Sequence, residues 1–174
     1  MATPAEPTEG GEAPELAKEL ARVYRALQTL SAGSRTLLRA SDEQDLLTEM
    51  WRVIVETGGY RMAGVAYAEH DEAKSIRWMA GNGIEMSLME TRNFTWADTE
   101  FGRTATANAI RTNHPVVGRH LHTDPAYDGP AYASVRETAL QRGYAAVTAF
   151  PLRVESEVLG ALIIYYSCNF RFLF

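Results

Sequence analysis

The chain has 174 residues, which is enough for one domain of ordinary size with a short appendage. Hydrophobic residues make up 46% of it and charged residues 22%, proportions that exclude disordered, collagen-like and disulfide-rich proteins. With 17 basic against 22 acidic residues the formal net charge is -5, so we expect no nucleic-acid partner. The longest apolar run, 158–166, is far shorter than the ~20 residues of a membrane-spanning helix, so no membrane segment is expected.

The first 14 residues combine three prolines and three glutamates with the pair Gly10-Gly11. They lack the basic start and the apolar stretch of a secretory signal. The sequence therefore predicts a disordered tail over 1–14 in a cytoplasmic protein. Cys168 is the single cysteine of the chain, which excludes an internal disulfide, a multi-cysteine zinc site and any mechanism that needs a second thiol.

Residues 15–40 contain no proline and predict one long helix. Apolar side chains recur along it at alternating spacings of four and three, at Leu16, Leu20, Val23, Leu27 and Leu30. This is the a/d pattern of a coiled coil. Gly33 lies in a polar stretch at 31–34, where we expect the helix to be interrupted. The stripe is narrow for a helix buried in a core, so it predicts a homodimer, parallel or antiparallel. The alternative is that the stripe packs against the sheet of its own chain.

A compact domain is predicted over 41–174. Its first helix begins with a capping box formed by Ser41 and Gln44 and ends at Gly58-Gly59. Further helices are expected at 84–90, at 98–111 with Asp98 or Thr99 as the cap, and at 131–142. Short segments rich in aromatic and β-branched residues predict six strands, at 60–68, 75–80, 93–96, 116–121, 145–153 and 158–167. The order of elements predicts an α+β fold around one mainly antiparallel sheet, and the last two strands are apolar on both faces, so helices should cover both sides.

Several segments resemble, in their order and spacing, those of a GAF domain. They are 59–66, 94–99, 104–111, 114–117, 124–125, 142–144, 150–152 and 159–162. The resemblance spans roughly 30–167. It implies a PAS-like six-stranded antiparallel sheet with helices on both faces, a small-molecule ligand or cofactor, and a sensory role in bacterial signal transduction. Family members usually continue into another helix after the last strand, whereas this chain ends in the phenylalanine-rich 168–174. We therefore expect an output domain that is not part of this chain, or a truncated fragment.

The resemblance also implies where a ligand binds, between the sheet and the segments joining strands three to five, here 94–144. The aromatic candidates for this pocket are Trp96, Tyr127, Tyr132 and Tyr144. The polar candidates are Asp98, Arg103, Asn108, Arg119, His120 and Asp124. Such a mixture of apolar walls and a few polar groups is typical of small-molecule sites. The aromatic residues could instead belong to the core, and the arginines could be solvated or capping.

The cofactor is not identified by these residues. His120 and His122 stand two apart at the end of a predicted strand and could hold a metal or haem, but surface histidines are the plainer interpretation. Bilin-binding GAF domains attach their chromophore to a cysteine beside the pocket, and the loop 124–130 has none. Some GAF proteins reduce free methionine sulfoxide, but this reaction needs two cysteines and the chain has only Cys168.

No catalytic constellation stands out, so we expect a binding module and no enzyme. The first hypothesis is a sensory domain that binds a small molecule. The alternative is a dimerisation and signal-relay module whose pocket is vestigial.

Overall fold

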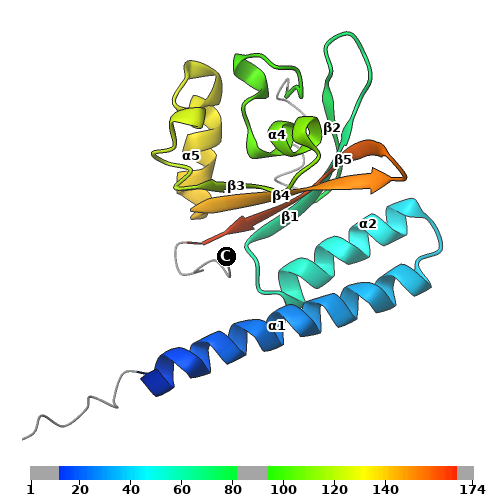
Figure 1. The fold of residues 1–174 in the computed structure, drawn as a ribbon, viewed down its shortest axis with the longest axis vertical. Coiled ribbons are helices and arrows are strands. Elements are labelled where there is room, and N and C mark those ends of the chain that lie inside the picture. The colour runs from blue at the N-terminus through cyan, green and yellow to red at the C-terminus, as the bar shows by residue number, and fades with distance from the viewer. Residues whose placement is uncertain (1–11, 82–93, 168–174) are drawn as a thin grey trace, which may run out of the picture.

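A five-stranded antiparallel sheet forms the centre of the described part of the chain (Figure 1). The structure is a computed structural model, and it describes residues 12–81 and 94–167. The strands stand in the order β2-β1-β5-β4-β3. Their bounds are β1 Met62–Ala68, β2 Ile76–Ala80, β3 Val116–Arg119, β4 Ala146–Val154 and β5 Glu157–Tyr166. The four long helices are α1 Glu12–Arg39, α2 Glu43–Arg52, α4 Ala105–Thr112 and α5 Ala133–Arg142.

The sheet is narrower than the six strands expected from the sequence. The segment 93–96 was predicted as a strand, but its described part forms only an isolated bridge between Thr95 and Ser75. Two further hydrogen bonds flank this bridge, because Ile76 N–H donates to the Phe94 carbonyl at 3.0 Å and Trp96 N–H donates to the Lys74 carbonyl at 2.8 Å. The helix predicted at 84–90 lies outside the described residues.

Helix α1 runs without a break, and the predicted interruption at 31–34 is wrong. Gly33 is buried, and a Cβ added to it would lie 3.4 Å from Cε of Met50 on α2. The absence of a side chain at Gly33 thus lets the two helices approach closely, and this packing offsets the low helix propensity of glycine. The helix begins at Glu12, three residues before the predicted start, and the rest of the predicted tail lies outside the described residues.

Helix α2 begins one residue later than the predicted capping box implies. The cap is Asp42, whose carboxylate accepts the Asp45 N–H at 2.8 Å, while Ser41 lies outside the helix. A single π turn, η1 Val53–Thr57, continues the helix. The chain then leaves the helix at Gly58 and Gly59, as predicted, with Gly59 in the left-handed conformation at φ 70°.

The elements form four layers: α1 packs on α2 and η1, α2 and η1 pack on the sheet, and α4 and α5 cover the opposite face (Figure 1). Adjacent residues of β5 show this division. Ile163 packs with the α4 side and Ile164 packs with Ile54 of η1. The expectation that helices cover both faces is therefore confirmed. No helix within the described ranges is both long enough and apolar enough to cross a membrane.

Candidate functional site

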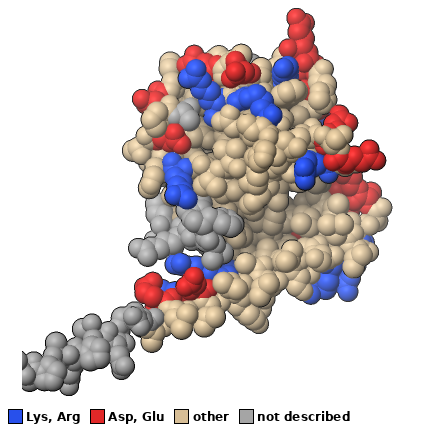
Figure 2. Space-filling view, viewed as in Figure 1, with Lys and Arg blue, Asp and Glu red and all other residues tan. Residues whose placement is uncertain are grey.

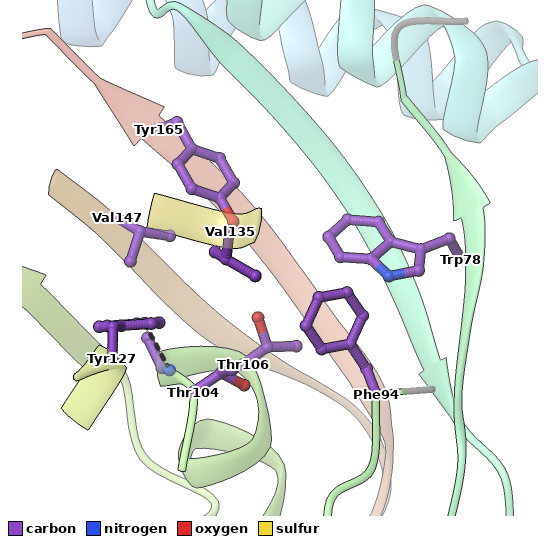
Figure 3. A pocket seen from close by; sticks show the side chains of 9 residues that line it. Trp78, Phe94, Thr104, Thr106, Tyr127, Val135, Val147 and Tyr165 are labelled. Atoms are coloured by element: carbon purple, nitrogen blue, oxygen red, sulfur yellow. Dashed lines mark hydrogen bonds between the residues drawn. The ribbon is translucent and has the colours of Figure 1, made fainter. Parts of the chain in front are cut away.

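A small cavity lies between the sheet and the start of α4 (Figure 3). Its volume is ≈ 20 Å³, about enough for one water molecule. Its walls are formed by three strands, the first turn of α4, and segments at η3, Pro125–Tyr127, and α5. The residues that line it are Trp78, Phe94, Thr104, Ala105, Thr106, Tyr127, Val135, Val147 and Tyr165.

The start of α4 brings backbone donors to this cavity. The helix is capped by Thr104, whose hydroxyl accepts the Ala107 N–H at 3.2 Å, and not by Asp98 or Thr99 as predicted. The Ala105 N–H donates to the Tyr127 hydroxyl at 3.2 Å (Figure 3). These N–H groups are therefore paired within the protein, but the first turn of a helix still carries partial positive charge, so this end of the cavity favours negative charge.

Trp78 supplies a buried donor to the wall of the cavity. It extends from β2 and is only 9% exposed. Its Nε1 has no hydrogen-bond partner in the described part of the structure. Figure 3 places this nitrogen on the edge of the indole that faces Phe94, which also lines the cavity. A buried N–H without an acceptor costs about 1–3 kcal/mol, so a ligand oxygen that reached it would be stabilised by the same order.

Two hydroxyl groups enter the same space. Thr106, buried in the first turn of α4, directs its hydroxyl toward Val135, and the hydroxyl of Tyr165 approaches from β5 (Figure 3). The nine described lining residues include no acidic and no basic side chain. The walls are therefore mainly apolar, with an indole N–H and hydroxyls as the polar groups, and they suit a ligand that accepts hydrogen bonds.

Two buried tyrosines hold the loops around the cavity. Tyr127 is the one predicted site residue that lines it, and burial raises the pKa of its hydroxyl to about 12. The Tyr132 hydroxyl donates to the Glu100 carbonyl at 2.7 Å and accepts the Arg103 N–H at 3.2 Å. Burial also raises the pKa of Tyr132. Both phenols thus remain neutral at physiological pH and fix the backbone around η2, Glu100–Gly102, and the start of α4.

Trp96, predicted as a wall of the pocket, lies against the turn between β1 and β2. Its Nε1 donates to the Glu69 carbonyl at 2.9 Å, and Lys74 Nζ lies 4.8 Å from its ring centroid. Arg111, which was not among the predicted site residues, connects this segment to α4. Its guanidinium donates to the carbonyls of Trp96 at 2.9 Å and Gly102 at 2.7 Å. This arginine therefore positions a loop beside the cavity.

The polar candidates are distributed over a wider region than the cavity. Asp98, Arg103, Arg119 and His120 are exposed, whereas Asn108 and Asp124 are half-buried. Arg103 and Asn108 are brought together, since the Asn108 amide donates to the Arg103 carbonyl at 3.1 Å. Asp124 and His120 are joined through the backbone, because the Asp124 N–H donates to the His120 carbonyl at 2.9 Å. None of these six is among the described residues that line the cavity, so their role as ligand contacts stays a prediction.

The two histidines lie beyond strand β3, although His120 was predicted within the strand 116–121. Strand β3 ends at Arg119, and His120 adopts a left-handed backbone conformation with φ 56° in the turn that follows. His122 is half-buried, and its Nδ1 has no hydrogen-bond partner among the described residues. Within residues 12–81 and 94–167 no three His, Cys, Asp or Glu residues gather closely enough to hold a metal ion.

Tyr144, the last predicted aromatic, is 5% exposed and stacks on Tyr165 with ring centroids 4.9 Å apart. It thus supports a wall of the cavity from behind. The lining residues outside the predicted segment 94–144 are Trp78, Val147 and Tyr165, one from each of three strands. The strands that carry them were predicted, but Val147 and Tyr165 lie on strands that are apolar on both faces, so the sequence does not identify the face toward which each residue points.

A second hollow, of ≈ 260 Å³, lies between α1 and α2. Its walls include both signs of charge, with Arg35 and Arg39 on α1 and Asp45 and Glu49 on α2. It is open and favours no single class of ligand, whereas the cavity at α4 presents donors on apolar walls. The latter is therefore the candidate functional site.

Comparison with known proteins bears on the fold. No family model and no curated protein matches the sequence. Solved structures do match. The GAF domain of Nlh2 from A. aeolicus, in an inactive state, superposes with a TM-score of 0.65 at 16% identity, covering 86% of this chain and 83% of that one. The chain has the fold of a GAF domain.

Two other structures with the GAF fold carry information about ligands. Free methionine-R-sulfoxide reductase from Neisseria meningitidis, in complex with its substrate, has a TM-score of 0.60 at 14% identity and covers 87% of this chain and 79% of its own. NreA from Staphylococcus aureus, mutated in its nitrate binding site, has a TM-score of 0.55 at 20% identity and covers 74% of this chain and 86% of its own. The fold thus accommodates small-molecule sites in other proteins.

Proposed function

We propose that this GAF domain is a cytoplasmic sensory module that binds a small molecule rich in hydrogen-bond acceptors, in the cavity at the start of α4. The observation that carries the proposal is the buried Trp78 N–H, which lacks a partner in the described structure and lines the same cavity as Thr106. The domain would pass its ligand state to a signalling output domain outside this chain.

The chemistry of the walls favours binding without catalysis. Donors are present as an indole N–H and hydroxyls, whereas the nine described lining residues offer no carboxylate, imidazole or thiol that could act as a general base or nucleophile. A volume of ≈ 20 Å³ holds about one water, so a ligand of several atoms requires outward movement of a side chain. Phe94 is suited to this movement because it lies in a loop and has no side-chain hydrogen bond to break.

The two ligand-bearing neighbours support the same class of ligand. Nitrate and methionine sulfoxide, the molecules associated with NreA and with the reductase, both carry oxygen atoms that accept hydrogen bonds. These two compounds are therefore the first probes for this chain, although its single cysteine, Cys168, argues against a thiol-based reductase.

Calorimetry and thermal unfolding with each probe test the proposal. A probe at one hundred times its Kd should stabilise the domain by about 2.7 kcal/mol and raise Tm by roughly 5–10 °C. Trp78→Phe removes one donor while keeping an aromatic ring, so the affinity should fall about tenfold or more. Trp51→Phe is the matched control, since its Nε1 also lacks a partner among the described residues but Trp51 packs with Ile54 on the other face of the sheet.

Native mass spectrometry of protein purified without added ligand extends the test to molecules beyond the two probes. A co-purified small molecule that disappears in Trp78→Phe and remains in Trp51→Phe would support the proposal. No bound molecule, no response to either probe, or equal binding by both variants would contradict it.

A second candidate function is dimerisation and signal relay with a vestigial pocket, and one observation favours it. The apolar stripe of α1 is exposed to solvent: Leu16 is 58%, Leu20 61% and Leu27 58% exposed. The same observation contradicts the alternative in which the stripe packs against the sheet of its own chain. A homodimer would explain the stripe whether or not the cavity binds a ligand.

A further inference from the structure

We infer that Arg111 is a positioning residue for the cavity: it holds one wall in place, so that a ligand enters past Phe94. The inference rests on the proposed function and deepens it, because it assigns how the same site opens. This wall belongs to the strap, residues 94–104, whose first and last residues, Phe94 and Thr104, both line the cavity (Figure 3). The stiffness of the strap therefore decides where the cavity can open.

One nitrogen of Arg111 closes the middle of the strap into a ring. Its Nη1 donates to the carbonyls of Trp96 at 2.9 Å, Ala97 at 3.0 Å and Gly102 at 2.7 Å. This nitrogen carries only two hydrogens, so one of them is shared between two carbonyls. Without a donor between them, the three part-buried oxygens would face one another and lack partners. The closed ring therefore depends on the guanidinium.

The ring leaves no room for a side chain at Gly102. A Cβ added there would lie 1.8 Å from the Ala97 carbonyl oxygen and 3.2 Å from Nη1 of Arg111. The backbone of the ring is bonded within itself as well, because the Thr99 N–H donates to the Ala97 carbonyl at 2.9 Å and the Gly102 N–H donates to the Thr99 carbonyl at 3.0 Å. The backbone thus packs directly on the guanidinium, and the ring opens only if Arg111 releases it.

Arg111 differs from the cations at the surface. Most of the lysines and arginines visible in Figure 2 project into solvent, several of them beside acidic groups. Arg111 is half-buried, and no carboxylate of the described residues forms an ion pair with it. Its Nη2 donates to Oδ1 of Asn108, and the Asn108 amide donates to the Arg103 carbonyl at 3.1 Å. Asn108 thereby orients the guanidinium and joins the strap to α4 a second time, next to Thr104.

The two ends of the strap are held in different ways. At the Thr104 end, the backbone itself is fixed, since the Arg103 N–H also donates to the buried Tyr132 hydroxyl at 3.2 Å. At the other end, the backbone of Phe94 accepts a hydrogen bond from the first residue of β2, but its side chain has no polar group and is held by packing alone. Rotation of the Phe94 side chain breaks no hydrogen bond, whereas Thr104 moves only if the ring breaks. The cavity therefore has a movable end and a fixed end.

The fixed end is useful to a binding site. A wall that keeps its position before and after binding costs little ordering of side chains and backbone when the ligand arrives. Loss of Arg111 would free Thr104 and the first turn of α4, and it would open the cavity at a second point. We therefore expect a variant without this guanidinium to bind ligands more weakly and to release them faster.

Hydrogen exchange followed by NMR tests the role of Arg111 without any ligand. In Arg111→Ala the amides of Thr99, Gly102 and Arg103 should exchange about tenfold faster or more, because the ring that protects them is no longer closed. The amide of Ile76, which donates to the Phe94 carbonyl at 3.0 Å, should keep its rate. Unchanged rates throughout the strap would overturn the inference.

Two further variants control for general effects of losing an arginine. Arg136→Ala removes a half-buried arginine on α5, on the same side of the sheet, which donates to Asp128 and not to the strap, so it should leave the strap rates unchanged. Arg111→Lys keeps the charge and decides the question if Arg111→Ala does not fold. Its single ammonium cannot reproduce the planar fork of donors, so the strap amides should exchange roughly threefold faster or more. Faster exchange throughout the chain, including Ile163 of β5, would overturn the inference by making Arg111 a general structural residue.

The indole N–H groups report whether the opening reaches the cavity. The Trp78 N–H should exchange about tenfold faster in Arg111→Ala, because water admitted at the Thr104 end enters the cavity that Trp78 lines. The Trp51 N–H, which packs on the other face of the sheet, should keep its rate. The Trp78→Phe and Trp51→Phe variants assign the two signals. An unchanged Trp78 rate in a variant whose strap amides exchange faster would overturn the role of Arg111 at the cavity.

Probe binding separates this inference from the proposed function. If nitrate or methionine sulfoxide binds the wild type, Arg111→Ala should weaken the affinity about tenfold and raise the dissociation rate, as measured by calorimetry and stopped flow. Equal affinity and equal dissociation rates would overturn the inference while the proposed function stands. If neither probe binds the wild type, the proposed function is contradicted, and the exchange rates of the strap and of Trp78 still decide whether Arg111 holds the wall.

Discussion

The two faces of the sheet are covered in different ways. On the α2 side, medium and large side chains interlock, with Leu47 against Val65 and Ile54 against Ile164. On the α4 side, three of the five buried residues of the helix are alanines, Ala105, Ala107 and Ala109, and most bulky side chains come from the strands and loops that surround it. The cavity lies at the first turn of this helix.

This difference shows how a domain of this size can combine stability with a binding site. A helix with alanines on its inner side is held close to the sheet along its length, and the space that larger residues would fill remains open beside its first turn. The α2 side lacks such an end, because η1 continues α2 to the start of β1 and fills the layer with Ile54 and Val55. The site therefore follows from the size of the side chains on α4.

The strongest test of this comparison uses neighbouring residues of β5. Ile163→Ala should lower the free energy of unfolding by about 4 kcal/mol, because Ile163 is 0% exposed and its cross-strand neighbours, Gly64 and Ala149, are too small to fill the space. Ile164→Ala should cost about 2 kcal/mol, since larger side chains on the α2 side can repack. Urea unfolding of both variants measures the difference. Equal losses would mean that the two faces do not differ in packing.

Alkaline pH should affect the two faces unequally. Burial raises the pKa of Tyr127, at the cavity, to about 12, above its unfolded value near 10. The unfolded chain then loses this proton first, so stability is complete below pH 10 and falls by about 2–3 kcal/mol as pH rises to 12. Tyr67, on the other face, also has a pKa of about 12, raised by partial burial and by its hydrogen bond to Glu43, but solvent screening makes its effect smaller.

Urea unfolding at pH 9 and at pH 11.5 checks this expectation in the wild type and in two variants. Tyr127→Phe should reduce the alkaline loss of stability clearly, and Tyr67→Phe should reduce it only slightly. If Tyr67→Phe reduced the alkaline loss of stability more than Tyr127→Phe, Tyr127 would not be the more deeply buried phenol.

Helix caps provide the smallest test. Thr104→Ala should cost about 1–2 kcal/mol, because the Ala107 N–H that it satisfies is buried beside the cavity. Asp42→Ala should cost about 0.5–1 kcal/mol, since water can replace the carboxylate at this exposed site. Ser41→Ala is the control and should change stability by less than about 0.5 kcal/mol. Thermal or urea unfolding measures all three variants. A larger loss of stability in Ser41→Ala than in Asp42→Ala would mean that Ser41 is the cap, as the sequence predicted.

Much of the fold could be predicted because its signals are local. Gly58 with Gly59 ended one helix and Gly143 ended another, since glycine adopts the left-handed conformation that closes a helix. The antiparallel pairing of β1 with β2 and of β4 with β5 followed from short polar turns between apolar segments. The structure of the segment at Thr95 could not be predicted from local signals. Whether it forms one bridge or a full strand depends on how many backbone groups the adjacent segment at Ser75 leaves for pairing.

The site was less predictable for a related reason. Trp78, Val147 and Tyr165 come from three strands and meet only through the register of the sheet. The role of Thr104 as a helix cap could have been predicted, because threonine is a good capping residue and the alanines that follow it allow close packing. Asp98 and Thr99 are also good capping residues, and the sequence alone does not show that η2 separates them from the helix.

The unbroken course of α1 carries any movement of its packed half to its exposed end. The helix packs on α2 and η1 from about Ala26 onward, and from Ala26 to Glu12 it extends over 14 residues, or about 21 Å. A tilt of only about 5° of the packed half would displace the far end by roughly 2 Å. A movement of α2 and η1 too small to disturb the sheet would thus become, at the far end of α1, a displacement of about a third of a helical turn.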